Sequence, residues 1–248
     1  MISISIIIAT YNSAETLERC LQSIVSQKNE RVELIIIDGD SKDGTQEIVN
    51  KYKPDIDYFL SEKDDGLYDA WNKGINTAKG NWIQFIGSDD MLLPDAISSY
   101  LDFIDNNNLE NIDYISARGE LVDINGQLLR YSGEAYSWKI FRNYMNVLHG
   151  SSLHSKYLFK EVGLYDLQYN ICADYELLLR KGENLRTLYF NKPILRMQVG
   201  GMSYSVKGLR ETFGMKKRHK TSSNLSNYYH FFKGLLVLKV KKSIWKMI

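Results

Sequence analysis

The feature that most constrains the fold of this chain is a series of short apolar runs separated by segments of helical periodicity. The runs Ile4–Ala9, Glu33–Ile37 and Trp82–Ile86 are rich in isoleucine and lack the polar alternation of a half-exposed strand. Such runs are typical of strands buried on both faces of a parallel sheet. Because helical segments alternate with them, the pattern predicts an α/β fold with a mostly parallel central sheet and helices on both faces.

The pattern changes after about residue 92, where the strand signals become shorter. Two strand-like segments, Leu121–Ile124 and Gln127–Tyr131, flank Asn125-Gly126, which is a hairpin signal. Short helices are predicted further along, over Trp138–Tyr144, Lys156–Val162 and Asp174–Lys181. No linker, repeat or low-complexity segment interrupts the chain, so we expect the second half to complete a cleft rather than form a separate domain.

Charge divides the chain into an acidic body and a basic tail. Residues 1–211 carry 22 Lys/Arg and 30 Asp/Glu, whereas residues 212–248 carry nine Lys/Arg and no acid. Such a tail suits contact with an anionic surface, and it equally suits a solvated helix face or a terminal helix docked on the core. On a helical wheel the lysines of Tyr228–Ile248 do not separate cleanly from its apolar residues, so the sequence leaves these interpretations open.

Several kinds of site are excluded by the motifs that the sequence lacks. It contains no G-x-G-x-x-G, Walker A, H-E-x-x-H or G-x-S-x-G motif, and its two cysteines form no disulfide framework. Basic residues cluster only in the tail and no nucleic-acid-binding module is recognisable, so we expect no nucleic-acid partner. No run reaches the roughly 18 apolar residues of a membrane span. Chemistry is therefore expected from carboxylates and loop backbone.

Carboxylates follow the predicted strands at the edge where open α/β sheets hold their ligands. Asp38, or Asp69 on a predicted helix, taken alone is more simply explained as a cap, a turn residue or a surface charge. The pair Asp89-Asp90 is harder to explain in that way, because adjacent like charges at the end of a buried strand repel one another. A bound Mg²⁺ or Mn²⁺ removes this cost, and such a cation can carry a diphosphate.

The sequence resembles the family 2 glycosyltransferases of the GT-A fold, especially those that build bacterial surface polysaccharides. The resemblance covers residues 2–203, and it is specific because five segments occur in a fixed order. They are Ile8-Ala-Thr-Tyr-Asn12, Ile37-Asp-Gly-Asp-Ser-Lys-Asp-Gly-Thr45, residues 61–75, Gly87-Ser-Asp-Asp90 and Ile171-Cys-Ala-Asp-Tyr-Glu-Leu-Leu-Leu-Arg180.

This resemblance implies a GT-A fold, with a single Rossmann-like domain and a C-terminal helical extension. The domain would span residues 1–205, in which residues 1–92 form the nucleotide-sugar-binding half and residues 93–205 the acceptor-side half. Residues 206–248 would form the basic helical tail.

The resemblance also implies which residues bind the donor. Thr10, Tyr11 and Asn12 would cradle the nucleotide, although Asn12 followed by Glu15 also resembles a helix capping box. Asp38 would hydrogen-bond the base or ribose. Further positions expected to line the nucleotide-sugar site are Asp69, Asn72 and Ser88.

The remaining implied roles concern the metal and the acceptor. Asp89, together with Asp90, would bind Mn²⁺ or Mg²⁺ on the diphosphate, although Gly87 stands where the family's Asp-x-Asp motif begins. Asp174 matches the family's general base. His149, Gly200 and Gly201 match positions near the active site or acceptor.

The implied activity is inverting transfer of a hexose or N-acetylhexosamine from a nucleotide-diphospho-sugar, with UDP-sugars favoured, to a lipid-linked or oligosaccharide acceptor. One carboxylate acting as base, with no protein nucleophile, gives a single displacement and a β-linkage. We expect a cytoplasmic enzyme, peripheral on the inner face of the bacterial inner membrane through its basic tail. Two alternatives stay open: a sugar-1-phosphate nucleotidyltransferase and a non-catalytic nucleotide-binding module.

Overall fold

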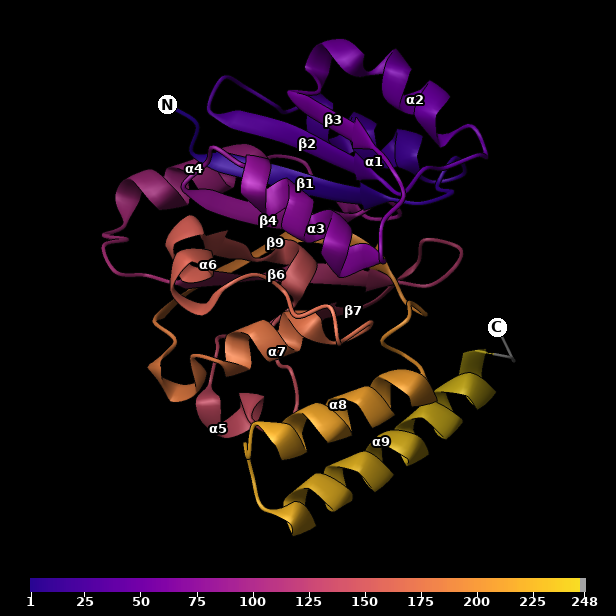
Figure 1. Ribbon diagram of the computed structural model, residues 1–248, viewed down its shortest axis with the longest axis vertical. Helices are drawn as coiled ribbons and strands as arrows, with labels where there is room; N and C mark the ends of the chain where they lie inside the picture. Colours follow the sequence, from indigo (N-terminus) through magenta and orange to yellow (C-terminus); the bar gives the residue numbers. More distant parts are fainter. Residues whose placement is uncertain (246–248) are drawn as a thin grey trace.

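The computed structural model describes residues 1–245, and side chains through residue 240 (Figure 1). Strands alternate with helices along the first hundred residues, as predicted. The strands are β1 (Ile4–Thr10), β2 (Val32–Asp38), β3 (Tyr58–Ser61), β4 (Trp82–Gly87), β5 (Met91–Leu92), β6 (Tyr114–Val122), β7 (Leu128–Ser132), β8 (Leu153–Ser155) and β9 (Thr187–Gln198). The α-helices are α1 (Leu17–Val25), α2 (Thr45–Lys51), α3 (Leu67–Thr77), α4 (Ala96–Asn106), α5 (Trp138–Phe141), α6 (Lys156–Val162), α7 (Ala173–Leu179), α8 (Val206–Arg218) and α9 (Asn224–Trp245). Three 3₁₀ turns join them, namely η1 (Lys53–Asp55), η2 (His149–Ser151) and η3 (Gly182–Asn184).

Within the described residues, the strands form one nine-stranded sheet in the order β3-β2-β1-β4-β8-β6-β9-β5, with β7 paired to β6. Strands β3, β2, β1 and β4 are mutually parallel, and β6 and β9 run in the same direction. The chain builds outward from β1 to β3 and then returns to place β4 on the other side of β1. The ends of β1 and β4 therefore form a topological switch point, where open α/β sheets bind ligands.

Both faces of the sheet are covered, which explains the unbroken apolar runs. On one face, Ile7, Ile35 and Phe85 pack with residues of α3, α6 and α7. On the other face, Ile6 and Ile36 pack with residues of α1 and α4. Successive residues of a strand point to opposite faces, so a strand buried on both sides needs apolar residues at every position.

The second half extends the same sheet, as expected, rather than forming a separate layer. The hairpin predicted around Asn125-Gly126 is confirmed as β6 and β7, and Gly126 takes the positive φ of 80° that the turn requires. Helix α6 has the predicted bounds and ends at Gly163, whose φ is 85°. The division into residues 1–92 and 93–205 stays a prediction, although one sheet runs through both.

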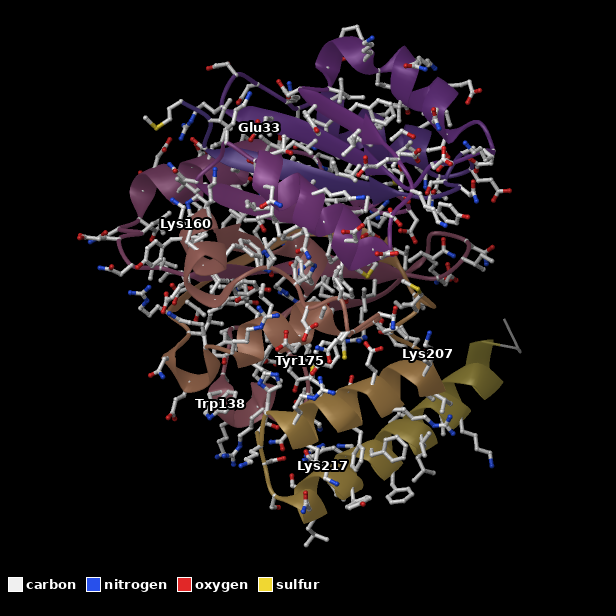
Figure 2. The ribbon with its side chains drawn as sticks, in the orientation of Figure 1. Glu33, Trp138, Lys160, Tyr175, Lys207 and Lys217 are labelled. Carbon is white, nitrogen blue, oxygen red and sulfur yellow. The ribbon has the colours of Figure 1, made fainter. Side chains whose placement is uncertain are left out.

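The C-terminal extension is helical, as predicted, and its residues 246–248 lie outside the described part. Helices α8 and α9 form an antiparallel hairpin beyond α7, on the side away from β1 to β3 (Figure 1). Lys207 and Lys217 lie near opposite ends of α8 (Figure 2). Glu211 of α8 accepts hydrogen bonds from the backbone N–H groups of Asn170, Ile171 and Cys172. The hairpin is thus tied directly to the segment that leads into α7.

Candidate active site

The loop after β1 is held against the loop after β2 by hydrogen bonds. Asn12 takes a positive φ of 48°, its N–H donates to Ser41 Oγ at 2.8 Å, and its Oδ1 accepts from the Lys42 N–H at 3.1 Å. The capping-box interpretation of Asn12 and Glu15 is wrong. Helix α1 has Thr16 at its N-cap, without a side-chain cap, because Asn12 is used between the loops.

Asp38, at the end of β2, lies at the centre of this arrangement. Its carboxylate is fully buried and accepts from Thr10 Oγ1 at 2.9 Å, from Ser61 Oγ at 2.7 Å and from both the N–H and the hydroxyl of Ser41. These donors come from the ends of β1 and β3 and from the loop after β2. Asp38 therefore holds together the strand ends and the loop that form the base of the candidate nucleotide site. Its contact with the base or ribose stays a prediction.

The side chains of Tyr11 and Asp64 both approach Gly39, which follows Asp38. Tyr11 is 67% exposed. A Cβ at Gly39 would lie 2.8 Å from Asp64 Oδ2 and 3.2 Å from Tyr11 Cδ2, so this position needs glycine for space. Burial raises the pKa of the Asp64 carboxyl. Asp64 was not predicted from the sequence. The run Asp64-Asp65-Gly66, with its paired carboxylates beside a glycine, was the signal that could have indicated it.

The carboxylates of Asp89 and Asp90 converge beside the end of β4. A Cβ at Gly87 would lie 2.7 Å from Asp89 Oδ1 and 3.1 Å from Asp90 Oδ2, so the absence of a side chain keeps open a space between the two oxygens. Asp89 is exposed, whereas Asp90 is 5% exposed and its pKa is raised well above the ordinary value by burial and by the charge of Asp89. Ser88 Oγ donates to Ser13 Oγ at 2.9 Å.

This pair fits a hard divalent cation that is only partly coordinated by protein. Hard cations prefer carboxylate oxygens, and Mg²⁺ is usually bound through one or two carboxylates plus phosphates and water. The described residues include no cluster of three His, Cys, Asp or Glu that could hold a metal by itself. Arg19 of α1, which sequence reasoning missed, donates to the Asp89 carbonyl oxygen at 3.2 Å and adds positive charge at this point.

Asp174, in the first turn of α7, is held by Tyr68 of α3. The Tyr68 hydroxyl donates to Asp174 Oδ1 at 3.1 Å, and the same oxygen accepts from the Tyr175 N–H at 2.8 Å. Burial, followed by the charge of Asp174, raises the pKa of Tyr68 well above its ordinary value, so the hydroxyl stays a donor. Asp174 Oδ2 makes none of these bonds.

The two other α3 residues predicted to line the nucleotide site are engaged within the protein. Asp69 pairs with Lys73 at 3.1 Å and accepts from the Asp65 N–H at 3.2 Å. The Asn72 amide donates to the Tyr165 carbonyl and accepts from the Tyr165 N–H, both at 2.9 Å. Asn72 thereby joins α3 to the segment before α7, and direct contact of either residue with the nucleotide stays a prediction.

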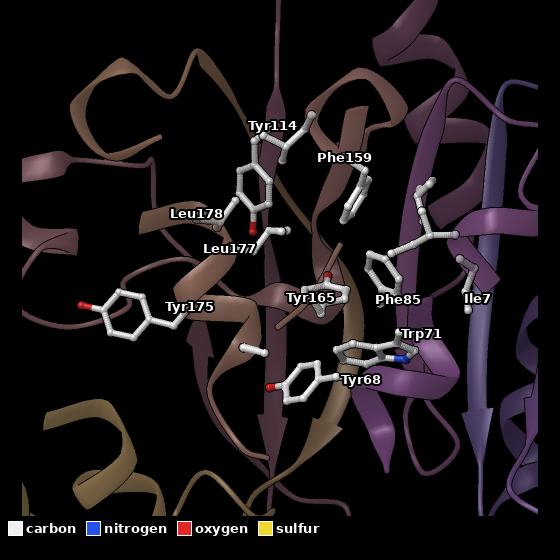
Figure 3. Close-up of a cluster of buried hydrophobic side chains, with 14 of the residues drawn as sticks. Ile7, Tyr68, Trp71, Phe85, Tyr114, Phe159, Tyr165, Tyr175, Leu177 and Leu178 are labelled. Carbon is white, nitrogen blue, oxygen red and sulfur yellow. The ribbon is translucent and has the colours of Figure 1, made fainter. Parts of the chain in front are cut away.

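His149 lies in η2, between the carboxylate pair that follows β4 and the residues around Asp174. Its ring stacks on Trp71 and Phe85, with centroid distances of 4.9 and 5.3 Å, and its Nε2 is 3.0 Å from the Tyr165 hydroxyl. Burial lowers the pKa of His149, which keeps the imidazole neutral near pH 7. Figure 3 shows the rings of Tyr68, Trp71, Phe85 and Tyr165 gathered in this buried cluster.

Sequence reasoning also missed Tyr68 and Tyr165, although a signal was present. The tetrapeptide Gly-Leu-Tyr-Asp occurs at residues 66–69 and again at 163–166. Both glycines have positive φ, 107° and 85°, and both tyrosine rings enter the same cluster with centroids 5.3 Å apart. Repetition of a short motif was a clue that the two tyrosines share an environment.

The predicted residues form two groups that η2 connects. Gly150, next to His149, would place a Cβ 3.7 Å from Asp90 Oδ2, so η2 reaches the carboxylate pair. Asp174 borders a cavity of about 470 Å³ whose lining includes neither Asp89 nor Asp90. Gly200 and Gly201 lie in the exposed loop between β9 and α8, where a Cβ at either would meet open space.

The strand order, the switch point and the carboxylate pair define a protein of the GT-A class. The solved structures that resemble this chain agree with that fold. The S. aureus TarS fragment 1–349 in complex with UDP-GlcNAc matches with a TM-score of 0.71 at 18% identity, over 92% of this chain and 69% of that one. Another TarS structure is matched over 39% of its chain. A mannosyltransferase from Pyrobaculum calidifontis, in complex with GDP-Man and Mn²⁺, matches with a TM-score of 0.65 at 14% identity, over 97% and 75%.

Sequence comparison then shows the family. The model of glycosyl transferase family 2 matches residues 5–157. A PGL/p-HBAD biosynthesis glycosyltransferase of Mycobacterium bovis is 31% identical over 209 residues, which are 82% of this chain and 79% of that protein. The chain belongs to glycosyl transferase family 2, as the resemblance predicted.

Proposed function

We propose that this glycosyltransferase moves a hexose or N-acetylhexosamine from a nucleotide-diphospho-sugar to a hydroxyl group, with inversion and a β-linked product. The observation that carries the proposal is the position of Asp174, whose Oδ1 is held by Tyr68 and the Tyr175 N–H while Oδ2 makes neither bond. A carboxylate held in this way is suited to accept a proton.

The chemistry follows from these residues. Asp174 accepts the proton of the acceptor hydroxyl while the oxygen of that hydroxyl bonds to the anomeric carbon of the donor sugar. The bond from that carbon to the diphosphate breaks, and the nucleoside diphosphate leaves with the electron pair. Because one displacement occurs and no protein nucleophile takes part, an α-linked donor gives a β-linked product.

The donor would lie across the ends of β1 and β4. Thr10, Tyr11, Asn12 and Asp38 would receive the nucleoside. Asp89 and Asp90 would hold Mn²⁺ or Mg²⁺, which when bound neutralises charge growing on the departing diphosphate. Ser88 would lie beside that diphosphate.

A UDP-sugar is the favoured donor within this proposal. The TarS fragment was solved with UDP-GlcNAc, whereas the Pyrobaculum calidifontis mannosyltransferase was solved with GDP-Man and Mn²⁺. The former matches this chain with the higher TM-score. The acceptor would be lipid-linked or an oligosaccharide, in the synthesis of a bacterial surface polysaccharide such as O-antigen.

The proposal includes a peripheral contact with the cytoplasmic face of the bacterial inner membrane. None of the described helices is long and apolar enough to cross a bilayer. Support comes from α9, where exposed apolar side chains recur every three or four residues and so share one helix face. They are Leu225, Tyr229, Phe232, Leu236 and Val240, which are 55–81% exposed and which we call the outer stripe.

Lysines accompany the outer stripe on both of its edges. At 100° per residue, Lys233 falls on one edge and Lys239 on the other. An aromatic and aliphatic face bordered by lysines is typical of helices that lie in a membrane interface, where each basic residue near an anionic surface contributes about 1 kcal/mol. On the outward face of α9 the two lysines thus lie at the edges of the apolar stripe. Around the whole helix, lysines and apolar residues do not separate in this way.

A direct test uses the purified chain with a panel of nucleotide diphosphates, each with and without Mn²⁺. We expect UDP to raise the melting temperature more than GDP, and to do so only with the metal, because binding to the folded state stabilises it by mass action. Incubation with UDP-sugars should release UDP. Pyrophosphate release from UTP and a sugar-1-phosphate would support the nucleotidyltransferase, and UDP binding without turnover on any acceptor would support the non-catalytic module.

A further inference from the structure

The cavity that borders Asp174 is lined mainly by apolar side chains of the helical extension. It lies between α7, α8, α9 and the segment 143–145, and it has a volume of about 470 Å³. Leu209 and Phe213 line it from α8, and Phe231 and Val237 line it from α9. None of these four can hydrogen-bond a sugar, so the cavity suits an apolar chain better than a saccharide.

Three basic groups line the same cavity. Lys216 is 3% exposed, and its ammonium donates to the Asn143 carbonyl at 2.8 Å. Burial lowers the pKa of Lys216 to about 8, and no ion pair to it is present among the described residues. Burial also lowers the pKa of His230, and the charges of Lys216 and of Lys233 lower it further. Both lysines are therefore close enough to His230 to disfavour its charged form.

The acidic groups of the cavity do not compensate this cluster. Within the described residues, Asp174 is the one acidic side chain in the lining. An anion bound beside Lys216 and Lys233 would offset the positive charge in the lining and supply an acceptor for their remaining donors. The lining thus combines apolar walls with a place for a phosphate.

Two residues of α9 place the cavity beside the outer stripe. Lys233 lines the cavity and borders the outer stripe, and Val237 lines the cavity while 43% of it is exposed. An apolar chain that leaves the cavity at Val237 therefore meets the helix face proposed above to contact the membrane. A chain inserted from a bilayer could enter along this route without crossing water.

We infer that this cavity holds the apolar chain and phosphate of a lipid-phosphate-linked acceptor, with its phosphate at Lys216 and Lys233 and its saccharide directed to Asp174. This inference rests on the proposed function, because it names the acceptor class of the same site. It assigns the α8–α9 hairpin a role in acceptor binding in addition to membrane contact.

The test measures binding of farnesyl phosphate, farnesol and inorganic phosphate to the full chain by calorimetry. Farnesyl phosphate should bind at least about tenfold more tightly than farnesol or phosphate, because it alone fills both parts of the cavity. Val237→Trp should weaken farnesyl phosphate binding by about tenfold or more by occupying the cavity, whereas Leu236→Trp, on the exposed neighbour, should leave it unchanged.

A second matched pair tests the phosphate position. Lys233→Gln should weaken farnesyl phosphate binding without affecting farnesol, and Lys239→Gln, outside the cavity, should affect neither. Equal binding of farnesyl phosphate and farnesol, or equal effects of Val237→Trp and Leu236→Trp, would overturn the inference. UDP-induced stabilisation should persist in all four variants, and failure of the proposed function would appear instead as absence of UDP binding in the unmodified protein.

Discussion

The Tyr68 hydroxyl donates to Asp174 Oδ1 at 3.1 Å, across 106 positions of sequence. This bond joins the first turn of α3 to the first turn of α7. Tyr68 also packs edge-on against Trp71, with centroids 5.4 Å apart, so its ring is held by packing as well as by the hydrogen bond. Asp174 is thus oriented by a residue whose own position is set by the buried aromatic cluster.

Removal of this hydroxyl should slow transfer without unfolding the protein. Tyr68→Phe keeps the ring and removes the bond, so we expect kcat to fall by about tenfold, an effect of about 1.4 kcal/mol, with KM for the donor little changed. Steady-state kinetics of UDP release would measure this. Tyr175→Phe is the matched control, because the Tyr175 hydroxyl donates to the Phe141 carbonyl instead; a similar loss of kcat in both variants would remove Tyr68 as a positioning residue.

Substitution at the carboxylate pair should separate metal binding from folding. Asp89→Asn removes the exposed carboxylate, so the rise in melting temperature that UDP gives in the presence of Mn²⁺ should be largely lost. The variant should fold normally, because Asp89 is exposed. Asp95→Asn, which changes a carboxylate at the N-cap of α4, is the control. An undiminished Mn²⁺ effect in Asp89→Asn would show that the cation binds elsewhere.

The buried imidazole of His154 should make the fold sensitive to acid. Burial, and then the neighbouring His149, lowers the pKa of His154 well below its ordinary value. The unfolded chain gains a proton as the pH falls through about 6.5, while the folded chain does not, so stability is lost below that pH.

His154→Phe should reduce this loss. The ring packs among Phe85, Tyr114 and Phe159, where phenylalanine fits by size and polarity. Between about pH 7.5 and 5.5, the free energy of unfolding should fall by about 1 kcal/mol less in the variant than in the unmodified protein. Urea unfolding at both pH values measures the difference, and His230→Gln, at a partly exposed site, should change it less. An unchanged pH dependence would contradict the assignment.

The outer stripe of α9 should carry the membrane contact. A variant with Tyr229→Ser, Phe232→Ser and Leu236→Ser should sediment less with anionic liposomes, because it loses apolar surface while it keeps every lysine. Leu128→Ser with Leu129→Ser, on the exposed strand β7, is the control for loss of apolar surface elsewhere. Equal sedimentation of the two variants with liposomes would refute the assignment of this face.

The central sheet was predictable because each buried strand carries its own signal. In β1 and β2 each residue is either apolar or hydrogen-bonded to the neighbouring strand, so the local sequence was sufficient. The capping-box interpretation of Asn12 was wrong, because its positive φ and its bond to Lys42 depend on a loop that comes 30 residues later. Local patterns cannot show a partner at that distance.

The candidate site was only partly predictable, for the same reason. Asp89 and Asp174 could be identified as carboxylates in family motifs, but the residues that orient them could not. The hydrogen bonds between the Asn72 amide and the backbone of Tyr165, 93 residues away, could not be predicted, and contact of Asn72 with the nucleotide stays a prediction. The outer stripe of α9 became visible only when the structure showed which face of that helix packs on α8.

The most direct test of the account is the transfer rate of Asp174→Asn. The substitution keeps Oδ1 as an acceptor for Tyr68 and Tyr175, so folding and UDP binding should match the unmodified protein, and only the proton acceptor is lost. We predict that sugar transfer falls by at least about a hundredfold while the UDP-induced rise in melting temperature is retained. Transfer at the unmodified rate would contradict the assignment of Asp174 as the base and, with it, the proposed mechanism.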